Sequence, residues 1–278
     1  MKLSLVRMAK KILLAGFLFG LLAPPAVLFL SSFAYMWRWP QLFPESFSLR
    51  AWQVVFQDPN IWSACFLSMM IGQGVVILNI VLGLPAGKAL AHYDFKGKSF
   101  IETFLLLPIL IPTLAVGMGI LLTVIQFGLA DTWIGVMLIH LVPTLPYTIR
   151  ILRAGYENIG TKYEDAARSL GASAWAVFRT VTFPLLFPSL RAVIVLTFVI
   201  SLSQYVLTAL IGGGRVVTLA MVYYPYLSSV DRPVIAALSV LFILIPILIL
   251  VILEICMAMR KRKRERQRKN DATYMASV

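Results

Sequence analysis

Six stretches of the sequence are apolar over a length that can cross a lipid bilayer, and this feature constrains the fold more than any other. A membrane-spanning helix needs about 20 mostly apolar residues, because it rises about 1.5 Å per residue through about 30 Å of hydrocarbon. The predicted spans are Ile12–Phe33, Ile61–Leu90, Phe100–Phe127, Trp133–Thr148, Ala192–Ile211 and Pro233–Met257. With 60% hydrophobic and 13% charged residues, the chain has too few polar side chains to cover a water-soluble core. The sequence therefore predicts an all-α membrane protein with six transmembrane helices.

The basic residues indicate how these spans are oriented. Of the 25 lysines and arginines, 21 fall in the termini or in alternate loops on one side, and four fall on the other side. Basic residues gather on the cytoplasmic side of membrane proteins, so both termini are expected in the cytoplasm. The expected organisation is a cytoplasmic N-terminus at 1–11, a six-span domain at 12–259 with a cytoplasmic loop at 150–190, and a basic cytoplasmic tail at 260–278.

The net charge of +13 has the same explanation, because the basic residues flank apolar spans and form no soluble patch. This arrangement argues against nucleic-acid binding. Eight of the ten residues from Arg260 to Lys269 are basic, which favours contact of the tail with anionic lipid headgroups. The two cysteines, Cys65 and Cys256, fall near opposite faces of the membrane, so no disulfide is expected.

The loop between the fourth and fifth spans carries the most local structural information. Thr161 and Glu164 have the spacing of a capping box, which predicts the start of a helix. Gly171 stands where a helix favours a left-handed residue at its end. Ser173 is suited to cap a second helix, and Pro184 is expected to end it. The sequence thus predicts two short helices with a bend at Gly171.

The first of these two helices is expected to have two distinct faces, because residues at i, i+3, i+4 and i+7 lie together. The apolar face consists of Tyr163, Ala166, Ala167 and Leu170, and the polar face of Thr161, Glu164, Asp165 and Arg168. Arg168 is expected to pair with Glu164 along the helix. Small apolar residues beside two acids suit docking into a groove of another protein. From the residues alone, an ordinary surface hairpin of helices is an equal alternative.

The spacing within this loop resembles the EAA motif of the permeases of ABC importers. That motif reads Glu-Ala-Ala, three residues, Gly, nine residues and Ile-x-Leu-Pro. Here Asp165-Ala166-Ala167, Gly171 and Val181-Thr182-Phe183-Pro184 stand at the same spacing. The departures are Asp for Glu, Val for Ile and Phe for Leu, and each keeps the charge or the apolar character. The resemblance covers most of the chain and is nearest to the spermidine/putrescine, iron and thiamine branch of the family.

The resemblance implies the type I ABC importer permease fold in a bacterial inner membrane. It implies that the loop couples to a dimer of ABC ATPase subunits through Glu164, Asp165, Ala166, Ala167, Gly171 and Pro184. It also implies an extracytoplasmic substrate-binding protein and a second permease subunit, either a copy of this chain or a paralogue. The sequence has no phosphate-binding loop of the Gly-x4-Gly-Lys-Ser/Thr kind. ATP and Mg²⁺ are therefore expected on the ATPase, and this chain is expected to be no enzyme and to bind no cofactor.

The fifth span is unusually polar for a helix that faces lipid, and it supplies the candidate residues of a substrate pathway. These residues are Ser201, Ser203, Gln204 and Tyr205. Hydrogen bonding between helices explains each of them singly just as well. The expected substrate is a small polar or charged solute.

An ion-coupled secondary transporter or channel is the main alternative function, and a membrane enzyme is the second. Ion-coupled proteins carry ionisable residues in mid-membrane. Here Glu102 and Glu254 fall near the cytoplasmic ends of their spans, and His140 is expected to serve hydrogen-bonded packing. No cluster of His, Asp and Glu stands at one depth, which argues against an enzyme and against a metal site.

Overall fold

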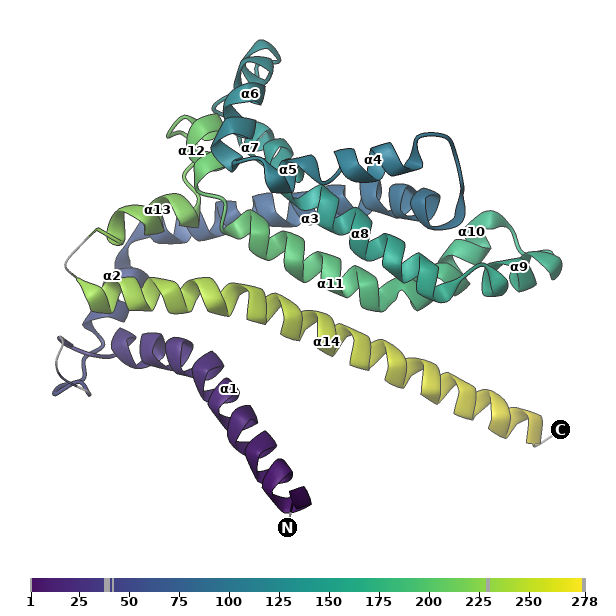
Figure 1. The fold of residues 1–278 in the computed structure, drawn as a ribbon, viewed down its shortest axis with the longest axis horizontal. Coiled ribbons are helices and arrows are strands. Elements are labelled where there is room, and N and C mark those ends of the chain that lie inside the picture. Colours follow the sequence, from purple (N-terminus) through teal and green to yellow (C-terminus); the bar gives the residue numbers. More distant parts are fainter. Residues whose placement is uncertain (1, 38–40, 42, 229–230, 277–278) are drawn as a thin grey trace. The chain divides into compact units, whose positions relative to one another are not determined.

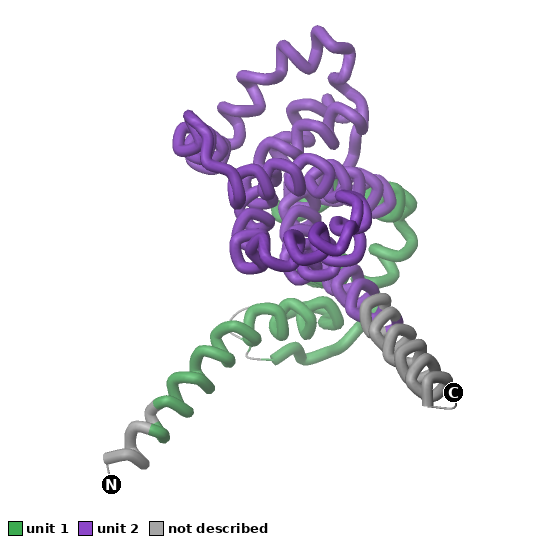
Figure 2. Tube along the Cα trace, turned by 90° about the vertical axis from the view of Figure 1, so that its right-hand side faces the viewer, with its two compact units in different colours: residues 1–64, 222–245 green, residues 65–221, 246–278 purple. Residues whose placement is uncertain are grey.

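A computed structural model of the chain describes residues 2–37, 41, 43–228 and 231–276, and these residues are predominantly helical (Figure 1). Among them the β-structure consists of one isolated antiparallel bridge between Ala34 and Phe47. The chain forms two compact units (Figure 2). Unit 1 consists of residues 1–64 and 222–245, and unit 2 consists of residues 65–221 and 246–278.

The helices divide between these units as follows. Unit 1 contains α1 (Lys2–Ser32) and α2 (Arg50–Gln57). The chain passes from one unit to the other within α3 (Pro59–His92), α13 (Leu219–Tyr226) and α14 (Arg232–Ala276). Unit 2 contains α4 (Lys98–Phe104), α5 (Leu107–Leu110), α6 (Thr113–Gln126), α7 (Trp133–Ile139), α8 (Leu141–Ile159), α9 (Lys162–Ser169), α10 (Ala174–Val177), the π-helical turn η1 (Phe178–Thr182), α11 (Phe183–Leu202) and α12 (Val206–Gly212).

Within the described residues, four helical segments are long and apolar enough to cross a membrane. They are Lys10–Ser32, Pro59–His92, Ala174–Leu202 and Arg232–Ile255. Two bent pairs reach that length together, α4 and α5 with α6, and α7 with α8, so the number is six if each pair is one span. The first, second and sixth predicted spans agree with these segments to within two residues at each end. The prediction of an all-α membrane fold is confirmed.

The third and fourth predicted spans are bent and not straight. The helices on either side of Ile111 and Pro112 meet at 105°, and α7 and α8 meet at 44° around His140. Proline lacks a backbone N–H, and Pro112 has extended backbone angles, so the helix breaks there. The fourth span also continues to Ile159, beyond its predicted end at Thr148.

The prediction of the fifth span, Ala192–Ile211, is wrong in its position. Helical structure runs from Ala174 to Leu202, and residues 203–205 then separate α11 from α12. The predicted loop at 150–190 includes Pro184 and Pro188, but both lie in α11 in the structure. Proline is tolerated in membrane helices where neighbouring groups take over the freed backbone bonds.

Close packing of α3, α8 and α11 forms the centre of unit 2, and α8 and α11 lie side by side (Figure 1). The buried residues there are Leu152, Tyr156, Leu186, Leu190 and Val193. A glycine allows α3 to approach α8: a Cβ at Gly87 would lie 3.0 Å from Leu152 Cβ and 3.1 Å from the backbone nitrogen of Arg153. The helices α9 and α10 lie at one end of the α8–α11 pair, where they form the candidate site (Figure 1).

Candidate functional site

The loop after α8 folds as predicted around Gly171. The N–H of Ala172 donates to the carbonyl of Ala167 at 3.1 Å, and the N–H of Gly171 donates to that of Arg168 at 2.9 Å. This pair of bonds is the Schellman arrangement that ends a helix, and it requires a left-handed residue. Gly171 has a φ of +82°, a conformation that costs glycine little. The predicted bend at Gly171 is confirmed.

The second part of the loop differs from the prediction. Ser173 caps α10 as expected, because its hydroxyl oxygen accepts a bond from the N–H of Ala176 at 3.3 Å. The prediction that Pro184 ends this helix is wrong, because η1 and α11 continue it and Pro184 lies in the first turn of α11. Proline lacks a backbone N–H, and the π-helical turn η1 directly precedes Pro184. Pro184 therefore lies inside a helical run that extends from Ala174 to Leu202.

Glu164 is buried, and it connects three segments of the chain. Its carboxylate accepts hydrogen bonds from Lys88 Nζ on α3, at 2.6 and 2.9 Å, and from the Thr182 hydroxyl of η1 at 2.7 Å. Only 5% of Glu164 is exposed. The predicted capping box is wrong, because the Thr161 side chain makes no capping bond and the Glu164 carboxylate points to Lys88 instead. The expected pair with Arg168 is present at 3.7 Å, longer than the Lys88 contact.

The electrostatics of Glu164 follow from these contacts. Burial by itself raises the pKa of the carboxyl, but the hydrogen bonds from Lys88 and Thr182 and the charges of Lys88 and Arg168 outweigh it. The pKa of Glu164 therefore lies below its ordinary value of 4.5. The group is an anion at neutral pH, held by a cation and a hydroxyl.

The pH dependence of stability tests this assignment. A carboxyl whose pKa is lowered by folding stabilises the protein above its unfolded pKa and loses that contribution as the pH falls through the folded pKa. We expect the purified chain to melt at a higher temperature than Glu164→Gln between about pH 5 and pH 8, with a constant difference, and the difference to close below about pH 4. Size-exclusion chromatography after heating measures this. A difference in melting temperature that already shrinks between pH 8 and pH 6 would contradict the lowered pKa of Glu164.

The outward face of α9 differs from the face that holds Glu164. Asp165 and Ala166 are exposed, and Leu170 is 88% exposed at the end of the helix. Tyr163 and, beyond the bend, Trp175 are also exposed. Exposed aromatic and aliphatic side chains beside a single carboxylate are typical of a docking surface. A partner that covers such side chains removes apolar area from water, which stabilises the complex. Glu164 and Asp165, which are predicted to share one face of the helix, thus face different surroundings.

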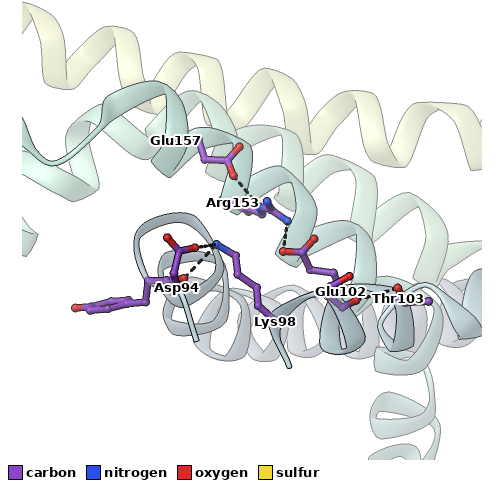
Figure 3. Close-up of polar contacts among 8 residues, drawn as sticks. Asp94, Lys98, Glu102, Thr103, Arg153 and Glu157 are labelled. Atoms are coloured by element: carbon purple, nitrogen blue, oxygen red, sulfur yellow. Dashed lines mark hydrogen bonds and ion pairs between the residues drawn. The ribbon is translucent and has the colours of Figure 1, made fainter. Parts of the chain in front are cut away.

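A polar cluster joins α4 to α8 near this loop (Figure 3). The Arg153 guanidinium lies between Glu102 and Glu157, at 2.7 Å from each carboxylate, and Lys98 pairs with Asp94 at 3.1 Å. Glu254 forms an ion pair with Arg191. The two acids in the predicted spans, Glu102 and Glu254, are thus each paired with an arginine. Neither is the unpaired mid-membrane carboxylate that an ion relay requires.

The candidate pathway residues do not share one environment. Ser201 is buried and its hydroxyl lies 2.9 Å from Nδ1 of His140, whose Nε2 lies 3.0 Å from the Thr208 hydroxyl. The expected packing role of His140 is confirmed. Ser203 is exposed, and Gln204 and Tyr205 complete the break between α11 and α12. Gln204 is half-buried, and its backbone carbonyl accepts a hydrogen bond from the Thr208 hydroxyl at 2.5 Å.

Lys88 and Thr182 are parts of the site that the sequence pattern does not predict. Lys88 is a lone cation near the end of a long apolar run, and this isolation was a signal that it has a specific partner. Thr182 lies inside the motif but at a position that the motif leaves open. Its π-helical turn is a further signal, visible in the structure alone, because π turns recur at functional sites.

Comparison with known proteins places these features in a family. Residues 79–265 match the family model described as binding-protein-dependent transport system inner membrane component. The molybdate/tungstate transport system permease protein WtpB of Thermococcus kodakarensis is 31% identical over 53% of this chain. The molybdenum transport system permease protein ModB of Escherichia coli K12 is 31% identical over 55% of this chain and 72% of its own length. The alignment with the Thermococcus protein covers 59% of that protein's length.

A solved structure shows a similar fold. It is described as a bacterial ABC transporter involved in the import of the acidic polysaccharide alginate. The match has a TM-score of 0.71 at 18% sequence identity, and it covers 89% of this chain and 94% of the other. At this identity the likeness concerns the fold and not the transported solute.

Proposed function

The chain belongs to the family of binding-protein-dependent transport system inner membrane components, and from this membership we propose that it is the permease subunit of an ABC importer in a bacterial cytoplasmic membrane. With a second permease subunit it forms the pathway for the solute. Its partners are a dimer of ABC ATPase subunits, which holds ATP and Mg²⁺, and an extracytoplasmic substrate-binding protein. The chain itself catalyses no reaction.

The observation that carries this proposal is the exposed surface of α9. Asp165, Ala166 and Leu170 face outward at the end of the α8–α11 pair, next to a bend held by Gly171. An ATPase groove that covers Leu170 and offers a basic group to Asp165 fits this surface in both shape and charge. The remaining coupling residues, Ala167, Gly171 and Pro184, shape the backbone on which these side chains stand.

We propose a small oxyanion as the solute. The relatives at 31% identity carry names that specify molybdate, tungstate or molybdenum. The segment from α11 to α12 contains no acidic residue, which suits an anion and not a polyamine. A carboxamide such as that of Gln204 carries two N–H donors, which can bind an oxyanion without a full positive charge.

Uptake by cells tests the proposed solute class. Deletion of this gene is expected to abolish accumulation of molybdate, tungstate or sulfate, measured by mass spectrometry of the elements, and the intact gene is expected to restore it. Uptake of spermidine, ferric iron and thiamine serves as the comparison. If one of these three is lost instead and the oxyanions accumulate normally, the proposed class is wrong.

Gln204→Ala is expected to reduce oxyanion uptake by about tenfold, which is the typical loss for one hydrogen bond to a charged group. The ATPase should remain bound, because Gln204 lies between α11 and α12 and is not part of the α9 surface. Gln126→Ala, an exposed amide at the end of α6, is the matched control and should transport normally. Equal uptake by the Gln204 variant and the wild type would remove Gln204 from the pathway.

A further inference from the structure

Two neighbouring acids on α9 face in opposite directions. Asp165 is exposed, whereas the Glu164 carboxylate is buried and uses both oxygens on partners inside the chain. A partner protein that covers α9 reaches Asp165 without reaching Glu164. Glu164 therefore does not act as a docking residue and has a different role.

The Glu164 contact is the polar link between α9 and α3. Among the described residues, Lys88 with Glu164 is the one hydrogen-bonded or ionic side-chain contact that joins these two helices. The short distances, 2.6 and 2.9 Å, and the low exposure make this pair stronger than an ion pair in water. Displacement of α9 away from α3 would leave a charge without a partner, which opposes that displacement.

The other contacts of this cluster extend the link into two long helices. Lys88 lies in the last turns of α3, with Nζ 6.0 Å from the centre of the Tyr156 ring of α8. Thr182, whose hydroxyl donates to Glu164, ends the π-helical turn that leads into α11. Helices transmit displacement along their axes because their backbone bonds resist stretching. A force on α9 thus reaches α3 through Lys88 and α11 through Thr182.

We propose that Lys88 and Glu164 are positioning residues that transmit the movement of α9 into α3 when the partner ATPase changes its nucleotide state. This inference rests on the proposed function. In it, Asp165 and Leu170 hold the ATPase, and the Lys88–Glu164 pair makes α3 follow α9. Loss of the pair leaves the ATPase bound and uncouples α3 from it.

Hydrogen exchange of the purified complex tests this transmission without knowledge of the solute. The complex is prepared without nucleotide and with ATP and vanadate, for the wild type, Lys88→Met and Lys88→Arg. In the wild type we expect exchange to differ between the two states both in α9 and in the last two turns of α3. In Lys88→Met we expect the difference in α9 to persist and the difference in α3 to be lost. Lys88→Arg keeps the ion pair, so we expect the exchange difference in α3 to be present in this variant.

Lys98→Met is the matched control, because it removes a lysine from an exposed pair with Asp94 and should change neither difference. A nucleotide-dependent difference in α3 that persists in Lys88→Met would overturn the inference and leave the proposed function intact. Loss of the ATPase from Lys88→Met would also overturn it, since the pair would then shape the docking surface. A wild-type chain that carries no ATPase would overturn the proposed function itself.

Discussion

Replacement of Asp165 with lysine together with Leu170 with serine is expected to release the ATPase from the chain while the chain stays folded in the membrane. Both side chains are exposed, so their replacement disturbs no packing within the chain. Reversal of the one carboxylate that faces outward brings like charges together at the interface, and the serine removes the most exposed large apolar side chain of the loop. The loss of such a contact is typically about 2 to 4 kcal/mol, which corresponds to roughly 30-fold to 1,000-fold weaker association.

The measurement is the amount of ATPase that copurifies with the tagged chain in mild detergent. Glu45→Lys is the matched control, because Glu45 is an exposed acid in unit 1, whereas α9 belongs to unit 2. Retention of the ATPase by the Asp165 and Leu170 variant, at the level of the control, would show that the α9 surface is not where the ATPase docks.

Gly87→Val is expected to destabilise unit 2 markedly. The new Cβ would lie 3.0 Å from Leu152 Cβ and 3.1 Å from the backbone nitrogen of Arg153, and backbone cannot move aside as a side chain does. Overpacking of a close contact costs about 1–3 kcal/mol, and a branched side chain against backbone belongs at or above the upper end of that range. The expected result is a large loss of monodisperse protein after heating, read by fluorescence-detected size-exclusion chromatography.

Gly16→Val is the matched control for this substitution. Gly16 also lies inside a helix, and a Cβ there meets no atom within 4 Å. Its heating profile should match that of the wild type. A Gly87 variant that is as stable as the Gly16 variant would mean that α3 and α8 do not approach each other as closely as described.

Features that depend on nearby residues could be predicted from the sequence. The three continuous spans, at Ile12–Phe33, Ile61–Leu90 and Pro233–Met257, follow from apolar length alone, because hydrocarbon thickness sets the number of residues. The turn at Gly171 and the cap at Ser173 follow from the chemistry of single residues. Each of these features is determined within a few residues of the position that signals it.

Features that depend on distant residues escaped prediction. The capping box at Thr161 fails because Glu164 finds a stronger partner in Lys88, 76 positions away. The predicted start of the fifth span at Ala192 is wrong because Pro184 indicates the end of a helix, whereas the packing of α11 against α8 keeps that segment helical. In both cases tertiary contacts override the local signal. The 105° bend before α6 is different, because its signal is local: Pro112 breaks the helix within a stretch whose apolar length alone predicts one straight span.

Identification of the proteins that copurify with the wild-type chain tests the central claim most directly. The chain, tagged at its C-terminus, is purified from its own membrane in mild detergent, and its companions are identified by mass spectrometry. We expect an ABC ATPase in fixed proportion to permease subunits, which are either this chain alone or this chain with a paralogue. A well-inserted chain that purifies alone, under conditions that preserve another ABC importer from the same membrane, would contradict it.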